Sequence, residues 1–155
     1  MPRIPSTLTG AAGEHFVACR LSALGYPTAL TRGGSPTVDL MVGSKTGQAT
    51  ISIQVKTSNW AWRGFKRKSE RNHWEWDVGR KGLELVSNNI LYAFVDMRWN
   101  DQSFALPDVF IVPSSVVADF LKPDWSRFMF WIMQNDKSNY HERWDFITNI
   151  LEGAV

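Results

Sequence analysis

The stretch TVDLMVGSKTGQATISIQVK, residues 37–56, decides the fold of this chain. Two short runs of alternating apolar residues flank the turn-rich segment 43–48, which is the pattern of an antiparallel β-hairpin. Because strand side chains alternate between faces, Asp39 lies opposite the apolar residues of the first run. Gln54 and Lys56 lie opposite the apolar residues of the second run for the same reason. The sequence therefore predicts a hairpin with one apolar and one polar face.

The polar side chains of this hairpin converge when its strands pair. Folding about the turn places Asp39 level with Gln54, and Lys56 follows two residues later on the same face. A carboxylate, an amide and an ammonium group on one strand pair indicate a hydrolytic site with a hard metal ion. Such cations prefer oxygen ligands and keep several waters, so the Val55 backbone carbonyl is the natural additional ligand.

Each of these polar residues also has a plainer interpretation. Asp39 can be a solvent-facing residue beside a turn, although strands are depleted in Asp. Gln54 is either a neutral oxygen ligand or a polar residue on an open sheet face. Lys56 either acts at the scissile phosphate, where it would position water or stabilise negative charge, or is an ordinary solvated lysine.

The rest of the chain alternates between helical and strand patterns. Thr9 is placed to cap a helix over 10–24, which carries Glu14 on its inward side. Glu14 either forms a local helix interaction or reaches the metal from the helix. The further elements are strands near 28–31, 90–96, 109–112 and 128–133, and helices over 114–121 and 139–151. This order predicts an α/β sandwich, a mixed β-sheet flanked by helices.

Bulk properties limit the class of protein. A chain of 155 residues with 44% hydrophobic residues can bury one substantial core, so we expect one domain. We expect its core over about 8–121 and a strand and helix extension over about 122–155. One cysteine excludes an internal disulfide framework and is typical of a reducing compartment, and the sequence has no 18-residue apolar run. We therefore expect a cytoplasmic protein with no membrane association.

A tryptophan-rich basic stretch follows the hairpin at residues 60–71. It supplies cations for phosphates and rings for stacking, or else its aromatic residues cover the core behind a solvated charged rim. Arg32 lies close to the predicted site and is a further phosphate candidate. The nucleic-acid-binding candidates are Arg32, Trp60, Arg63, Lys66, Arg67, Lys68 and Arg71.

The order Glu14, Asp39, Gln54-Val55-Lys56 resembles the PD-(D/E)XK nuclease superfamily, which has the restriction-endonuclease-like fold. In that family a helix carries a Glu, and the following hairpin carries an Asp and a (D/E)-x-K strand. Gln54 departs from the usual acidic residue, as in some branches that include a group I intron homing endonuclease and Holliday-junction-resolvase-like proteins. The segments AFVDM, PDVFIVPSSVV and YHERWDF further resemble small uncharacterised bacterial members.

The resemblance implies a catalytic set of Glu14, Asp39, Gln54 and Lys56. It implies Mg²⁺ or Mn²⁺ held by Asp39, the Val55 carbonyl, Glu14 and Gln54. The expected function is metal-dependent endonuclease cleavage of DNA phosphodiester bonds, leaving a 5′-phosphate. The expected partners are duplex or branched DNA and further copies of the chain in a homodimer or higher homo-oligomer.

Two other functions remain open at this point. Because Gln54 supplies no charge, the chain can be a catalytically inactive nuclease-fold protein that binds nucleic acid. It can also be a protein-interaction or immunity module whose Trp-rich face contacts protein.

Overall fold

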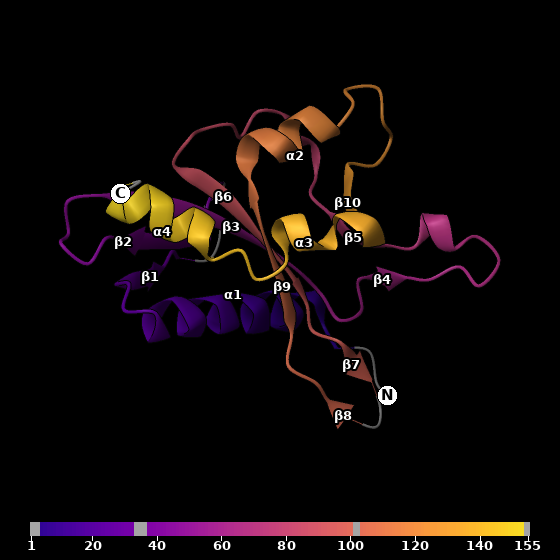
Figure 1. The fold of residues 1–155 in the computed structure, drawn as a ribbon, viewed down its shortest axis with the longest axis horizontal. Helices are drawn as coiled ribbons and strands as arrows, with labels where there is room; N and C mark the ends of the chain where they lie inside the picture. The colour runs from indigo at the N-terminus through magenta and orange to yellow at the C-terminus, as the bar shows by residue number, and fades with distance from the viewer. Residues whose placement is uncertain (1–3, 33–36, 101–102, 154–155) are drawn as a thin grey trace.

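The computed structural model describes residues 4–32, 37–100 and 103–153, and its centre is a five-stranded sheet in the order β1-β2-β3-β6-β9. The strands are β1 (Thr28–Leu30), β2 (Leu40–Gly43), β3 (Thr50–Ser58), β6 (Ile90–Asp96) and β9 (Asp108–Pro113). β3 and β6 run parallel, and the other neighbours are antiparallel. The sheet is therefore mixed, and Figure 1 shows helices on both of its sides.

A second, three-stranded sheet packs beside the first, in the order β10-β5-β4. Its strands are β4 (Trp62–Arg63), β5 (His73–Asp77) and β10 (Met129–Met133). A separate hairpin pairs β7 (Trp99–Asn100) with β8 (Ser103–Phe104). The helices are α1 (Ser6–Ala23), α2 (Ser114–Phe120), α3 (Lys137–Tyr140) and α4 (Asp145–Glu152), with 3-10 turns η1 (Ser69–Arg71), η2 (Arg80–Leu83) and η3 (Gln134–Asp136).

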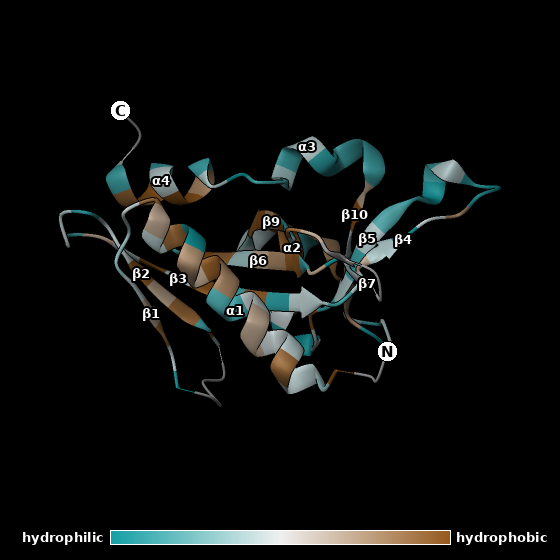
Figure 2. Cartoon of the chain, turned by 90° about the horizontal axis from the view of Figure 1, so that it is seen from below, coloured by the Kyte–Doolittle hydropathy of each residue, from teal (hydrophilic) through white to brown (hydrophobic). Residues whose placement is uncertain are grey.

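The two faces of the central sheet bury separate hydrophobic cores. α1 and α4 cover one face, where Val17 and Ile147 pack against the buried Ile53 of β3. Figure 2 shows α1 crossing this face when the molecule is seen from below. On the other face, Trp76 of the second sheet packs with Phe94 of β6 and with residues of α2. The alternation of side chains therefore directs Gln54 and Lys56 to the face opposite α1.

The hairpin over residues 37–56 forms as predicted. Leu40 pairs with Ile53 and Gly43 with Thr50. The core shared with α1 buries the hairpin residues Leu40, Val42, Ile51, Ile53 and Val55. The expected mixed sheet flanked by helices is confirmed. None of the described helices is both long and apolar enough to cross a membrane.

The first helix begins one turn earlier than predicted. Pro5 is its N-cap, and the helix starts at Ser6, so Thr9 lies inside the helix and not at its end. The Thr9 Oγ1 hydrogen-bonds to Asn59 Oδ1 at 3.1 Å, which ties α1 to the end of β3. Proline is tolerated next to a helix start because its missing N–H is not needed there.

The closing helix is shorter than predicted because a non-helical segment precedes it. The range 139–151 contains the end of α3 and most of α4, which are separated by residues 141–144. His141 forms an isolated antiparallel bridge with Phe110, and Glu142 has a φ of 54°. The positive φ of Glu142 interrupts the helix, and Trp144, Ile147 and Leu151 are buried.

Candidate active site

Asp39 lies where the backbone of the hairpin changes direction. Its N–H donates to the Ile53 carbonyl of β3 at 2.9 Å, and its C=O accepts from the Thr31 N–H beside β1 at the same distance. A residue in a regular strand directs both groups to one neighbour. The bonds to opposite neighbours therefore hold Asp39 at a bend, immediately before β2 begins.

The Asp39 carboxylate accepts the hydrogen bond that the backbone of β2 would accept from β3 if the pairing of the two strands continued past Leu40. Its Oδ2 accepts the Val55 N–H at 2.7 Å and a second hydrogen bond from Gln54 Nε2. The Val55 carbonyl points to the same edge of β3 as its N–H, because both groups of a strand residue face one neighbour. Outside the sheet ladders, no described residue donates a backbone hydrogen bond to this carbonyl. Asp39 Oδ1, the Gln54 amide oxygen and the Val55 carbonyl thus provide oxygen atoms near the start of β2.

Glu14 is brought toward Asp39 because α1 packs very closely on β3. A Cβ added at Gly13 would lie 1.9 Å from Thr57 Oγ1, so only glycine permits this approach. The Thr57 Oγ1 is itself buried without a hydrogen-bond partner in the part of the chain that the structure describes. Glu14, the next residue of α1, consequently lies within electrostatic reach of Asp39.

Both carboxyl groups bind protons more strongly than they do in water. Burial raises the pKa of Glu14, the charge of Asp39 raises it further, and His15 opposes both. Burial also raises the pKa of Asp39, against the opposing effects of the Val55 N–H and the positive charge of Lys56. Two carboxylates that are partly desolvated and mutually repulsive are stabilised by a nearby cation.

The donor set fits a hard divalent cation with an incomplete protein shell. In residues 4–32, 37–100 and 103–153 no cluster contains three or more His, Cys, Asp or Glu side chains placed to hold a metal. The protein offers two carboxylates, an amide oxygen and a backbone carbonyl at this edge. Mg²⁺ commonly binds one or two carboxylates and keeps its remaining positions for water and phosphate oxygens.

Gln54 and Lys56 open onto a cleft of about 890 Å³. The cleft is also lined by Tyr92, the β6 residue that pairs with Gln54, and burial raises the pKa of this tyrosine to about 12. The lining residues are Thr37, Gln54, Lys56, Val78, Gly79, Arg80, Lys81, Glu84, Leu85 and Tyr92. Sequence reasoning missed Arg80 and Lys81, although a pair of cations between two glycines is a recognisable loop signal.

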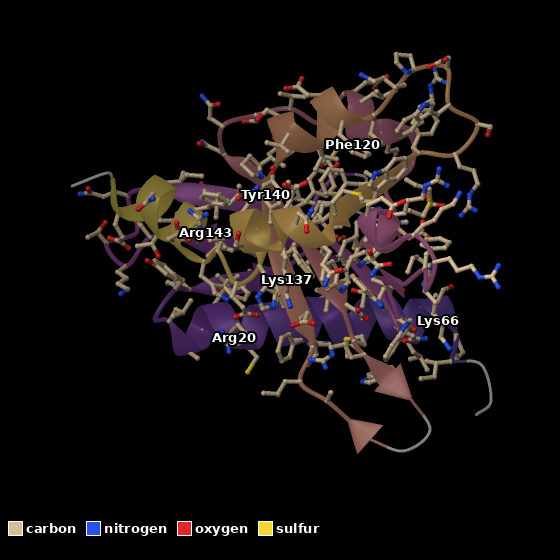
Figure 3. All side chains as sticks on the ribbon, turned by 45° about the vertical axis from the view of Figure 1, so that its right-hand side comes forward. Arg20, Lys66, Phe120, Lys137, Tyr140 and Arg143 are labelled. Atoms are coloured by element: carbon tan, nitrogen blue, oxygen red, sulfur yellow. The ribbon has the colours of Figure 1, made fainter. Side chains whose placement is uncertain are left out.

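The basic stretch forms a turn at the far end of the second sheet. Lys66, Arg67, Lys68 and Arg71 are all exposed, and Figure 3 shows Lys66 at the end of the molecule away from Arg143. These four side chains therefore lie on the surface, whereas Arg63 lines a separate hollow beside Lys56.

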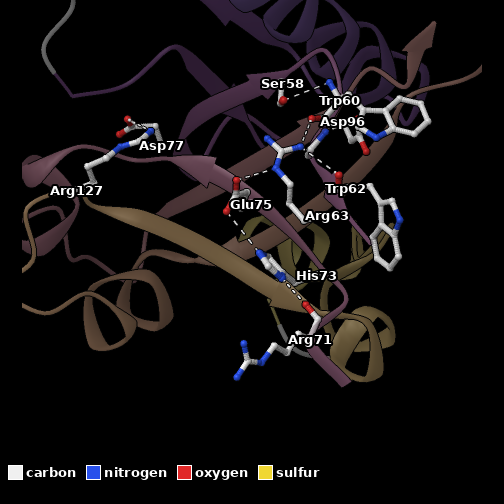
Figure 4. Close-up of polar contacts among 11 residues, drawn as sticks. Ser58, Trp60, Trp62, Arg63, Arg71, His73, Glu75, Asp77, Asp96 and Arg127 are labelled. Carbon is white, nitrogen blue, oxygen red and sulfur yellow. Dashed lines mark hydrogen bonds and ion pairs between the residues drawn. The ribbon is translucent and has the colours of Figure 1, made fainter. Parts of the chain in front are cut away.

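Arg63 is held by the protein itself. Its Nε donates to Glu75 at 2.8 Å, and its Nη1 donates to the carbonyls of Trp60 and Trp62 (Figure 4). Trp60 itself is 46% exposed. Arg32 lies at the end of the first described segment.

Comparison with solved structures finds a match over nearly the whole chain. The match covers 94% of this chain and 93% of the bacterial homing endonuclease I-Ssp6803I, with a TM-score of 0.57 and 14% sequence identity. This chain is similar in fold to a homing endonuclease. At 14% identity the likeness establishes the fold and not the chemistry. Sequence comparison finds no matching family model and no matching curated protein.

Proposed function

We propose that the protein is a metal-dependent endonuclease that hydrolyses phosphodiester bonds in DNA. The observation that carries the proposal is that two partly desolvated carboxylates, Glu14 and Asp39, interact electrostatically and that the charge of Lys56 acts on Asp39. This arrangement lies on a hairpin and helix that resemble the PD-(D/E)XK superfamily. The likeness to a homing endonuclease fold supports the same class of reaction.

The oxygen atoms at the edge of β3 would hold Mg²⁺ or Mn²⁺. Asp39 and Glu14 would supply the charge, and the Val55 carbonyl and the Gln54 amide oxygen would supply neutral ligands. When bound, the cation would polarise the phosphate and lower the pKa of a coordinated water. Gln54 also keeps the Asp39 carboxylate in place, because its Nε2 donates to Oδ2.

Lys56 acts on the substrate side of this arrangement. Its side chain lines the cleft together with Gln54, and its positive charge opposes the raised pKa of Asp39. An ammonium group here would position the attacking water and stabilise the negative charge that develops on the phosphate. These roles put the scissile phosphate at the mouth of the cleft.

A binding protein without catalysis is the second candidate. It is favoured by Gln54, which supplies no negative charge at the position where the resembling family has an acidic residue. The exposed cations of the turn, Lys66, Arg67 and Lys68, would then bind nucleic-acid phosphates with or without metal.

A cleavage assay separates the two candidates. Supercoiled, linear and branched DNA would be incubated with Mg²⁺ or Mn²⁺ and with the wild type or with Asp39→Ala, Lys56→Ala or the control Lys45→Ala. Lys45 is a suitable control because it lies in the hairpin turn, with its Nζ 5.2 Å from the centroid of the Tyr26 ring. We expect metal-dependent products from the wild type and Lys45→Ala alone.

The other results of this assay are equally informative. DNA binding by folded wild type without any cleavage would reject the nuclease and support the binding protein. Direct conversion of supercoiled DNA to linear DNA would support a homodimer or higher oligomer, because cutting both strands at once requires two sites.

A further inference from the structure

The cleft has two walls that differ in origin. One wall is the polar face of β3 with Gln54 and Lys56, and the other is the segment around η2 with Arg80 and Lys81. The residues of the two walls are far apart in sequence and meet only in the folded chain. The second wall belongs to neither the hairpin nor the basic turn.

The backbone of η2 packs closely against its neighbours, and this packing keeps Arg80 and Lys81 beside the cleft. A Cβ added at Gly82 would lie 2.6 Å from Val78 Cγ1 and 2.8 Å from Leu121 Cδ1, which shows how closely η2 packs on the end of α2. Gly79 has a φ of +78°, a conformation that glycine adopts without strain. The Gly82 N–H donates to the Gly79 carbonyl at 3.1 Å and closes the turn. Arg80 and Lys81 therefore project from a closely packed backbone.

The charge of the cleft favours a polyanion. Of the described residues that line it, three are the cations Lys56, Arg80 and Lys81, and one is a carboxylate, Glu84. The lining of this open cleft of about 890 Å³ therefore carries a net positive charge. A cleft lined mainly by one sign of charge concentrates the field and attracts phosphates.

The hollow on the other side of Lys56 has a different charge. It measures about 250 Å³ and is lined by Lys56 and Arg63 together with the carboxylates Glu75 and Asp77. Arg63 is paired with Glu75, and Asp77 lies 3.7 Å from Arg127 (Figure 4). Its cations are balanced by carboxylates, so this hollow is a poor path for a phosphate backbone.

We propose that the DNA strand to be cut passes through the η2 cleft, where Arg80 and Lys81 bind the phosphates next to the one at Lys56. The proposal rests on the proposed function for its scissile phosphate and extends the site to a segment outside the motif. Arg80 and Lys81 are substrate-binding residues in this arrangement, and they share the cleft with Lys56 and with Gln54, one of the proposed metal ligands.

The test measures DNA binding without metal, so that it does not depend on cleavage. A fluorescent short duplex would be titrated in EDTA at several salt concentrations with the wild type, with Arg80→Ala/Lys81→Ala and with Lys45→Ala/Lys122→Ala. The control removes two cations that do not line the cleft. The slope of log K against log salt is negative, and removing one phosphate-binding cation reduces its magnitude by about 0.9. We expect the magnitude of the slope to fall by about 2 in the cleft variant and to stay at the wild-type value in the control.

A second measurement modifies the DNA instead of the protein. Neutral methylphosphonate linkages placed one at a time along the duplex should weaken wild-type binding at the contacted positions, and the cleft variant should lose this sensitivity at one or two of them. An unchanged salt slope in a folded cleft variant, or an equal fall in the control, would overturn the proposal. If the cleft variant loses binding while no protein cleaves, the strand path stands and the nuclease proposal fails.

Discussion

At the scale of single residues, the neutral side chain of Gln54 keeps the negative charge of the site low. Its Nε2 donates to Asp39 Oδ2, whereas a carboxylate at position 54 would repel Asp39. The amide thus holds Asp39 in position in the absence of any cation. A carboxylate at position 54 would be the third at this site, after Glu14 and Asp39, and would need a cation to offset the added repulsion.

The substitution Gln54→Glu tests this account. It replaces a hydrogen bond with a like-charge contact, so we expect the free energy of unfolding in EDTA at neutral pH to fall by about 1–3 kcal/mol. Added Ca²⁺ should restore more stability to the variant than to the wild type. Urea unfolding provides the measurement, and Gln48→Glu in the exposed hairpin turn is the matched control. Equal effects of the two substitutions would contradict the account.

Glu14 gives a pH-dependent prediction, because its pKa is raised in the folded protein. Between its ordinary value of 4.5 and the raised value the folded state binds more protons than the unfolded state. Stability from this group is therefore lost as the pH rises through that window. Glu14→Gln should raise Tm at neutral pH in EDTA and have little effect below the window, where the wild-type residue is protonated in both states. Thermal unfolding across this pH range measures the effect, and a Tm of Glu14→Gln below that of the wild type at neutral pH would contradict it.

The same variant tests the metal site. A cation at about 100 times its dissociation constant stabilises the wild type by about 2.7 kcal/mol, and Glu14→Gln should lose most of this gain because it weakens the affinity. Thermal unfolding with and without Ca²⁺ measures the effect. The exposed Glu70→Gln is the control, and a metal-induced gain in Glu14→Gln as large as that in the control would remove Glu14 from the ligand set.

At the scale of elements, the approach of α1 to β3 places the helix carboxylate at the hairpin. The contact depends on Gly13, whose missing side chain leaves room for Thr57. Gly10 lies one turn earlier on the same helix and has no atom within 4 Å of an added Cβ. The two glycines therefore form a matched pair.

We expect opposite results from alanine at these two positions. Gly13→Ala should destabilise the protein by about 1–3 kcal/mol, because the added methyl group forces the helix from the sheet. Gly10→Ala should stabilise it by up to about 1 kcal/mol, through the higher helix propensity of alanine. Urea unfolding measures both, and the Thr57→Ala substitution should recover part of the stability in the Gly13→Ala background. Equal stability of the two single variants would show that the helix can move without cost.

Element boundaries were only partly predictable from the sequence. The pattern of the hairpin encodes its register, because a slip of one residue would expose Leu40 and Ile53. The prediction that Thr9 caps a helix beginning at Gly10 was wrong, since a cap-forming residue also occurs inside helices when its side chain finds another partner. That partner, Asn59, is distant in sequence and adjacent only after folding.

At the scale of the whole molecule, Trp76 joins the second sheet to the central one. Its Nε1–H donates to the Val95 carbonyl of β6 at 3.0 Å. The centroid of its ring lies 5.1 Å from that of the Phe94 ring and 5.4 Å from that of the Phe110 ring. Both sheets therefore share one core on this side. The wall of the cleft formed by η2 follows shortly after β5 in the chain.

Trp76→Ala should cost about 3–5 kcal/mol, because it removes a buried indole and leaves a carbonyl without its donor. For a chain of this size each kcal/mol corresponds to about 2–4 °C in Tm. The exposed Trp60→Ala should change the stability by no more than about 0.5 kcal/mol. Calorimetry distinguishes the two, and a Tm of Trp76→Ala equal to that of Trp60→Ala would show that the second sheet does not depend on this contact.

The sequence by itself determined the hairpin, its polar face and the convergence of Asp39 with Gln54. Those features depend on the alternation of strand side chains and on a short turn, both of which are local. Only the tertiary structure decided that Glu14 lies within electrostatic reach of Asp39 and that Arg80 and Lys81 line the same cleft as Lys56. These placements depend on the close packing of Gly13 on Thr57 and of Gly82 on Leu121, contacts between distant segments whose geometry no local pattern encodes.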